Sequence, residues 1–331
     1  MPDTAFGQTG LRPSALAFGC NHIALNRGRD RRREAEAALA EAHEAGINFF
    51  DIADVYARGE SERMLGRVLG RHRDRIIICS KAGFTFPVDP RLIRWIRPLT
   101  GPVIKRSRSA ARAAAMMRRG LGLESLKLKP DPEQKPEPEH NFGPEYIRRA
   151  IEASLRRLRT DFLDIFLLHS PPVDVLYHER LFDVLETLRD AGKIRYYGIS
   201  CSTRVTPADA AACARREGIS VLQIPVNVLN TAVFEAVEPV AAERRIAVIA
   251  REPFARGGIF EDPDVIAKLS QAPGRSPAQA AIRFVAQVTG GSVVLAGMSS
   301  RAHVRECRDS LEGEPLHPDI MHALHPGGRA P

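Results

Sequence analysis

The sequence predicts an α/β protein whose 331 residues form one domain, a (β/α)8 barrel of the TIM type. Short β-forming runs alternate with amphipathic helical stripes, and this alternation implies parallel strands joined by helical crossovers. There are eight such runs, which fit a closed barrel better than an open sheet. No Gly-x-Gly-x-x-Gly motif follows the first run, which argues against a Rossmann sheet.

The expected barrel strands are short runs rich in branched, aliphatic and aromatic residues. They cover residues 15–18, 47–51, 76–80, 163–168, 194–199, 221–226, 246–250 and 292–296. We also expect an N-terminal β-hairpin ahead of the first barrel strand.

Helices between these strands are expected where apolar residues recur every three or four positions. Ser61 is the expected N-cap of the second helix, Pro144 is expected to open a later one, and Thr206 and Ser276 are each followed by a helix-starting proline. The stripes are Ala35, Ala38, Leu39 and Ala42; Met64, Leu65, Val68 and Leu69; Ile147, Ile151, Ser154, Leu155 and Leu158; and Leu181, Val184, Leu185 and Leu188.

Residues 87–140 interrupt the alternation after the third strand. This stretch holds 12 Lys and Arg against 6 Asp and Glu, and its second half is rich in proline. Connections longer than about 12–15 residues are usually functional lids or disordered segments. We expect an insertion or lid within the barrel domain, with a helix over residues 108–119, because too few apolar residues are present for a separate core.

Composition narrows the function classes. Hydrophobic content of 44% and charged content of 27% are ordinary for a globular protein, and a net charge of +8 comes without any nucleic-acid-binding motif. The five cysteines form no Cys-x-x-Cys pair, so we expect reduced thiols and no structural metal. No secretory signal or apolar run of about 20 residues is present. We expect a cytoplasmic protein without a membrane or nucleic-acid partner, and the oligomeric state stays open.

Polar groups follow three consecutive predicted strands. Asp51 ends the second strand with Tyr56 five residues later, Lys81 follows the third strand, and His169 follows the fourth. Barrel enzymes carry catalytic residues at the C-terminal ends of their strands, so these groups are expected to meet at one mouth. Taken singly, each has an ordinary structural interpretation, such as a turn cap, a solvated loop residue or a core histidine. Their joint placement favours catalysis.

The four groups suit reduction of a carbonyl. A phenol has an ordinary pKa of about 10, and a nearby ammonium lowers that pKa by stabilising the phenolate. Tyr56 would give its proton to the carbonyl oxygen, Lys81 would tune Tyr56, and Asp51 would hold Lys81. His169 would orient the carbonyl. Hydride would come from a reduced nicotinamide, because side chains cannot supply it.

Several segments resemble the aldo-keto reductase superfamily. They are residues 50–56 (FDIADVY), 59–62 (GESE), 154–158 (SLRRL) and 164–169 (DIFLLH), together with Lys81 after the third strand. The resemblance covers almost the whole chain except residues 87–140. It implies an NADP-dependent oxidoreductase of the TIM-barrel type in which Asp51, Tyr56, Lys81 and His169 have the roles given above.

The resemblance also implies a cofactor, NADPH with NADH as the alternative, and a set of residues that bind it. Cys201 stands where the family usually has Asn, and Arg251 stands where it often stacks a Tyr on the nicotinamide. The full set is Ser200, Cys201, Gln223, Arg251, Phe254, Arg256, Gly297, Ser299, Ser300, His303, Glu306 and Cys307.

The phosphate end of the cofactor is expected after the eighth strand, where a helix begins near Arg301 and its amides favour an anion. His303 and Cys307 replace a frequent Arg and Asn of the family, and Arg301 and Arg305 are the expected substitutes. Candidate substrate contacts are His22, Phe84 and Trp95. Trp95 lies in the insertion and either lines a pocket or packs the lid.

The sequence leaves the substrate of a reductase open and allows two other classes of function to be weighed against it. The substrate is an aldehyde or ketone, or it is a biosynthetic intermediate such as a nucleotide-linked sugar with a conjugated double bond. Some members of the family bind nicotinamide and act through a partner, so a regulatory subunit with slow or no turnover is a second class. A metal-dependent hydrolase is disfavoured because the histidines lack paired ligand spacing.

Overall fold

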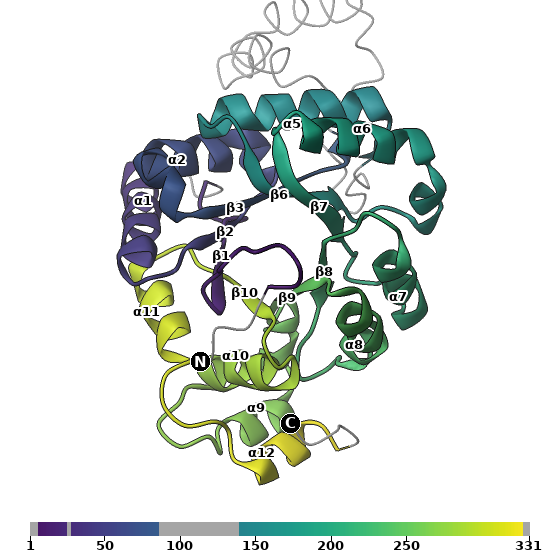
Figure 1. Ribbon diagram of the computed structural model, residues 1–331. Helices are drawn as coiled ribbons and strands as arrows, with labels where there is room; N and C mark the ends of the chain where they lie inside the picture. The colour runs from purple at the N-terminus through teal and green to yellow at the C-terminus, as the bar shows by residue number, and fades with distance from the viewer. Residues whose placement is uncertain (1–5, 25–27, 86–138, 327–331) are drawn as a thin grey trace, which may run out of the picture. The chain divides into compact units, whose positions relative to one another are not determined.

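A closed barrel of eight parallel strands lies inside a ring of helices (Figure 1). The computed structural model describes residues 6–24, 28–85 and 139–326. Around the barrel the strands follow the order β1-β10-β9-β8-β7-β6-β3-β2. They are β1 (Leu16–Gly19), β2 (Phe49–Asp51), β3 (Ile77–Ala82), β6 (Leu163–His169), β7 (Ile194–Ser200), β8 (Val221–Pro225), β9 (Ala247–Arg251) and β10 (Val293–Gly297).

The predicted fold class is confirmed, and no strand boundary differs from its predicted position by more than two residues. Helices surround the barrel (Figure 1). They are α1 (Arg29–Glu44), α2 (Glu60–Leu69), α5 (Pro144–Leu158), α6 (Glu179–Asp190), α7 (Pro207–Arg215), α8 (Ala232–Arg244), α9 (Pro263–Leu269), α10 (Pro277–Val288), α11 (Arg301–Asp309) and α12 (Pro318–Leu324).

The core has two layers because successive strand residues point to opposite faces. Phe49 belongs to the cluster that fills the barrel, whereas its neighbour Phe50 packs in the layer between barrel and helices. The four predicted helical stripes lie against the barrel, with Val68 and Val184 as the partly buried members.

Helix starts agree with the sequence at three of four predicted positions. Pro144 opens α5, the Thr206 side chain accepts the Asp209 amide, and Ser276 forms a full capping box at the start of α10. The prediction for Ser61 is wrong. Gly59, with φ 80°, stands at the N-cap of α2 because the preceding turn is left-handed, and Ser61 lies inside the helix with its side chain buried.

The expected N-terminal β-hairpin is not formed by residues 6–14, and residues 1–5 lie outside the described part of the chain. The stretch instead turns across the N-terminal end of the barrel. Phe6 is buried edge-on against Phe49, and the Thr9 hydroxyl donates to the Phe6 carbonyl at 2.6 Å. Residues 6–14 are therefore held at the N-terminal end of the barrel by side-chain packing, and they form no strand pairs.

A second unit, Phe84–Asn141, separates from the barrel unit Met1–Gly83 and Phe142–Pro331. Its described residues include an antiparallel pair, β4 (Phe84–Thr85) with β5 (Glu139–His140). The predicted helix over 108–119 and most of the predicted insertion lie outside the described residues. A single domain with an inserted lid stays a prediction. Among the helices that the structure describes, none has the length and apolar character required to cross a bilayer.

The close approach of β7 to β8 at Gly198 yields a stability prediction. A Cβ atom there would lie 1.8 Å from the Val221 carbonyl oxygen. Gly198→Ala is expected to lower the free energy of unfolding by about 3 kcal/mol, because backbone atoms of two strands must separate. Gly70→Ala is the control, since its Cβ would meet no atom within 4 Å and Gly70 has φ −56°. Denaturant unfolding curves measure both, and equal midpoints would contradict the packing described here.

Candidate active site

The polar site is the next layer of the barrel interior above the apolar one. Phe49, Cys79 and Leu167 fill the barrel, and the residue two positions further along each strand lies on the same face, closer to the C-terminal end. On β2, β3 and β6 these residues are Asp51, Lys81 and His169. The corresponding residues of β8, β9 and β10 are Gln223, Arg251 and Gly297. The strand alternation therefore brings the predicted catalytic residues of β2, β3 and β6 to one mouth.

A buried ion pair lies at the centre of this layer. Lys81 Nζ donates to both carboxylate oxygens of Asp51 at 2.6 Å and to the Ile52 carbonyl at 3.0 Å. Only 1% of Lys81 and 3% of Asp51 is exposed. Because three acceptors satisfy the three ammonium protons, the charged pair tolerates burial.

Hydrogen bonds connect this ion pair to β8 and β7, which are not adjacent to β2 or β3 in the barrel. Gln223 Nε2 donates to Asp51 Oδ1 at 2.8 Å, and Ser200 Oγ donates to Gln223 Oε1 at 2.7 Å. Asp51, Gln223 and Ser200 thus form one hydrogen-bonded chain that links the catalytic candidates to the candidate cofactor residues. Both cofactor candidates are buried.

Tyr56 is held over the ion pair by a left-handed turn. Its amide donates to the Ala53 carbonyl at 3.2 Å, and the following Ala57 and Arg58 have φ of 48° and 57°. Lys81 Nζ lies 5.4 Å from the centroid of the Tyr56 ring. The His169 ring stands edge-on to it at 6.0 Å between centroids, with an interplanar angle of 84°. The structure therefore gathers all four predicted catalytic residues.

The electrostatics of Tyr56 differ from the sequence-based expectation. Burial raises the pKa of the Tyr56 phenol, and this effect exceeds the lowering by the positive charge of Lys81. Burial also opposes the charged form of Lys81, but Asp51 and Tyr56 together hold the pKa of Lys81 above its ordinary value. The expected lowering of the Tyr56 pKa by Lys81 is therefore present, but in the free protein the opposing effect of burial is larger. The phenol keeps its proton beside a charged ammonium.

A second buried cluster, which sequence reasoning missed, supports the Tyr56 turn. Asp54 donates its amide to the Lys81 carbonyl at 3.0 Å, and its Oδ1 is buried without a hydrogen-bond partner among the described residues. Burial, then the charge of Glu62, raises the pKa of Asp54 to about 7 against the lowering by Arg157. Glu62 is fully buried, pairs with Arg157 and accepts the Ser80 hydroxyl at 3.0 Å. The sequence signal for this cluster was the position of Asp54, two residues before Tyr56.

The candidate nicotinamide residues occupy two different environments. Arg251 donates to the Cys201 carbonyl at 2.6 Å and pairs with Glu252, and its buried Nε has no hydrogen-bond partner in the described ranges. The Cys201 thiol is hydrogen-bonded to Cys213 of α7, and both cysteines belong to the core cluster between the barrel and the helices.

Three further cofactor candidates lie after β9 or at the end of β10. Phe254 is partly buried and its ring lies 5.8 Å from that of Phe260. Arg256 has φ 59° inside a short helical segment (Ala255–Phe260). Gly297 is exposed, and a Cβ there would lie 3.6 Å from Asn21 Oδ1, a buried oxygen that lacks a hydrogen-bond partner in the described ranges.

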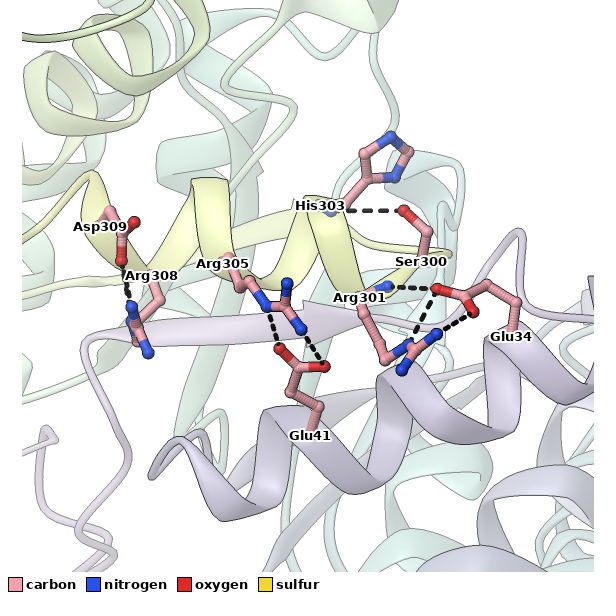
Figure 2. A network of polar contacts seen from close by, with 8 residues as sticks. All are labelled: Glu34, Glu41, Ser300, Arg301, His303, Arg305, Arg308 and Asp309. Atoms are coloured by element: carbon pink, nitrogen blue, oxygen red, sulfur yellow. Dashed lines mark hydrogen bonds and ion pairs between the residues drawn. The ribbon is translucent and has the colours of Figure 1, made fainter.

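The remaining cofactor candidates surround helix α11 (Figure 2). Ser300 caps the helix through the His303 amide at 3.3 Å, and Ser299 Oγ lies 3.5 Å from His303 Nδ1. Glu306 accepts the Ser276 hydroxyl at 2.8 Å, which ties it to the start of α10. Cys307 faces the core, and burial raises the pKa of its thiol to about 12.

The substrate candidates are the least defined. His22 is exposed in the loop after β1. Phe84 belongs to the second unit, where its ring lies 4.6 Å from that of His140. Trp95 lies outside the described residues. In the described ranges, no three His, Cys, Asp or Glu side chains are grouped as metal ligands would be. The roles of all these candidates stay predictions.

The raised pKa of Asp54 predicts a pH dependence of stability. Between its ordinary pKa of 3.8 and about 7, the folded chain holds a proton at Asp54 that the unfolded chain has released. Stability of the wild type is therefore expected to fall relative to Asp54→Asn as the pH rises through this window, with no further change above it. Denaturant unfolding at several pH values measures the difference. Asp74→Asn, at an exposed carboxylate, is the control, and a difference independent of pH would refute the role of Asp54 burial.

Comparisons with known proteins agree with this architecture. A curated relative, 6-dehydroglucose reductase of Novosphingobium aromaticivorans, is 26% identical over 92% of this chain and 89% of its own length. The uncharacterized oxidoreductase YqkF of Bacillus subtilis is 26% identical over 78% of this chain and 66% of its own length.

Solved structures show the same fold. The holo form of aldo-keto reductase AKR11C1 from Bacillus halodurans superposes with a TM-score of 0.72 at 24% identity, covering 98% of this chain and 95% of that one. An aldo/keto reductase from Klebsiella pneumoniae, solved in complex with NADP and acetate, gives 0.70 at 22% identity, covering 100% and 97%. The model of the Aldo/keto reductase family matches residues 15–325. The chain belongs to the aldo/keto reductase family of oxidoreductases.

Proposed function

We propose that this protein reduces an aldehyde or ketone to an alcohol, with NADPH as the hydride donor and NADH as the alternative. The buried Asp51–Lys81 pair beneath the Tyr56 phenol carries the proposal, because it sets a proton donor beside a fixed positive charge. The family and the NADP complex of the Klebsiella pneumoniae relative support the cofactor. The name of the Novosphingobium aromaticivorans relative, a 6-dehydroglucose reductase, supports a carbonyl substrate.

The residues at the mouth fit a nicotinamide. Ser200 and Gln223 supply a hydroxyl and an amide of the kind that hydrogen-bonds a carboxamide, and they already bond one another at 2.7 Å. Arg251 offers a planar guanidinium whose buried Nε has no partner in the described ranges, and such a plane stacks on aromatic rings. When bound, a reduced nicotinamide supplies the hydride.

The residues of the chain perform the proton transfer. Tyr56 donates its phenolic proton to the carbonyl oxygen as that oxygen becomes negative. Lys81 stabilises the phenolate that remains, and Asp51 keeps Lys81 charged and in place. His169 stands edge-on to Tyr56 and donates a hydrogen bond that orients the carbonyl. The same groups serve the reverse oxidation, with the phenolate as base.

Membership of the family also supports a proposal for where the protein acts and on what class of compound. We propose a cytoplasmic enzyme that acts on a small carbonyl compound, with neither nucleic acid nor a membrane as partner. A regulatory subunit with slow or no turnover is the alternative from the sequence, because some family members act through a partner and because Cys201 and Arg251 depart from the usual cofactor contacts. The insertion that could dock a partner lies largely outside the described residues. No structural feature of the described ranges favours it.

Removal of the phenolic hydroxyl tests the proton donor. Tyr56→Phe is expected to lower turnover of a carbonyl substrate by about 10²–10⁴-fold while leaving cofactor affinity within a small factor, since only proton transfer is lost. A panel of aldehydes and ketones, followed by oxidation of NADPH, measures turnover. Tyr177→Phe removes the hydroxyl of an exposed tyrosine and serves as the control. Equal turnover in wild type and Tyr56→Phe would refute the assignment.

Ligand-dependent stability tests the cofactor without knowledge of the substrate. A ligand that binds only the folded state stabilises it by about 2.7 kcal/mol at a hundred times its Kd. NADPH is expected to raise the melting temperature of the wild type by several degrees, with NADH measured beside it. A melting temperature unchanged by either nucleotide would contradict the proposed oxidoreductase activity.

A further inference from the structure

A carboxylate from α1 occupies the start of α11 (Figure 2). The Arg301 amide donates to Glu34 Oε1 at 2.9 Å, and the Arg301 guanidinium contacts the two oxygens at 3.3 and 3.2 Å. A second amide at this helix start is capped from within the same segment, because the His303 amide donates to Ser300 Oγ at 3.3 Å. Two amides that a helix start normally leaves free are therefore already hydrogen-bonded.

A second ion pair fixes α11 on α1 one turn further along. Arg305 contacts the Glu41 carboxylate at 2.6 and 3.4 Å. Figure 2 shows that Arg301 and Arg305 reach toward α1, whereas Ser300 and His303 lie on the other side of α11. The two guanidiniums expected to attract a phosphate are thus paired with acids.

Glu34 is bound there as an anion. The hydrogen bond from the Arg301 amide, followed by that from its guanidinium, lowers the pKa of Glu34. The carboxylate thereby satisfies both the helix dipole and the nearby arginine. A phosphate arriving at this helix start has to displace Glu34 or lie beside its negative charge.

We propose that Glu34 is a specificity residue that disfavours the 2′-phosphate of NADPH at the start of α11. This inference rests on the proposed function, because it assumes that a nicotinamide dinucleotide binds at the mouth with its adenosine end near the loop between β10 and α11, where barrels commonly hold phosphate. NADH carries a neutral hydroxyl in place of that phosphate and leaves the Glu34–Arg301 contact intact. The chain is therefore expected to discriminate little between the two cofactors.

Glu34→Gln keeps the shape of the side chain and removes its charge, while Glu41→Gln makes the same change in the pair that does not touch the helix start. Calorimetric Kd values for NADPH and NADH are to be measured for the wild type and both variants. Glu34→Gln is expected to tighten NADPH binding relative to NADH by about fivefold or more, because a like charge is removed from the phosphate site. Glu41→Gln is expected to leave the ratio of the two Kd values within about twofold, since its charge is farther from that site.

Adenosine 2′,5′-bisphosphate and ADP serve as probes that lack the nicotinamide. The bisphosphate is expected to gain affinity in Glu34→Gln, and ADP is expected to bind both proteins alike. An unchanged ratio of Kd values in Glu34→Gln, with normal NADPH binding by the wild type, would overturn the role of Glu34 and leave the proposed function standing. Failure of the wild type to bind either dinucleotide would overturn both.

Discussion

The site depends on one buried ion pair. Lys81 and Asp51 lie at the C-terminal ends of adjacent parallel strands, and almost none of either side chain is exposed. Burial of two charges costs several kcal/mol per ion unless hydrogen bonds satisfy them. Here the ammonium has three acceptors, and one carboxylate oxygen also accepts the Gln223 amide. The barrel therefore fixes a positive charge where solvent cannot screen it.

This pair connects the chemistry to the rest of the mouth. Through Gln223 and Ser200 it orients groups on β7 and β8, and through its contact with Tyr56 it orders the phenol. Because burial raises the pKa of Tyr56 in the free protein, the phenol would enter the proposed reaction in its protonated form. Negative charge that develops on a substrate oxygen would meet both a proton donor and the field of Lys81. The same low-polarity setting that raises the pKa thus strengthens the electrostatic assistance.

The strand periodicity allowed much of this to be predicted. Alternation of strands and helices specified the barrel, and the rule that barrel strands present functional groups at their C-terminal ends located Asp51, Lys81 and His169. The features that could not be predicted depend on burial and on contacts between residues far apart in the sequence. The net pKa shift of Tyr56 balances desolvation against charge, which a sequence does not reveal. Glu34 and Arg301 are 267 positions apart, so only the folded chain shows that they meet.

The most direct test is a titration of the phenol at position 56 with and without the charge at Lys81. With Tyr56 replaced by 3-fluorotyrosine, ¹⁹F NMR follows ionisation of that one ring in an otherwise wild-type protein and in Lys81→Met. The ion-pair account predicts that the midpoint of Lys81→Met lies at higher pH than that of the wild type. In the double variant Lys81→Met with Asp51→Asn, which also lacks the carboxylate that Lys81 would have paired, the midpoint is again expected above the wild-type value, but by a smaller shift. A midpoint that does not move when Lys81 is replaced would contradict it.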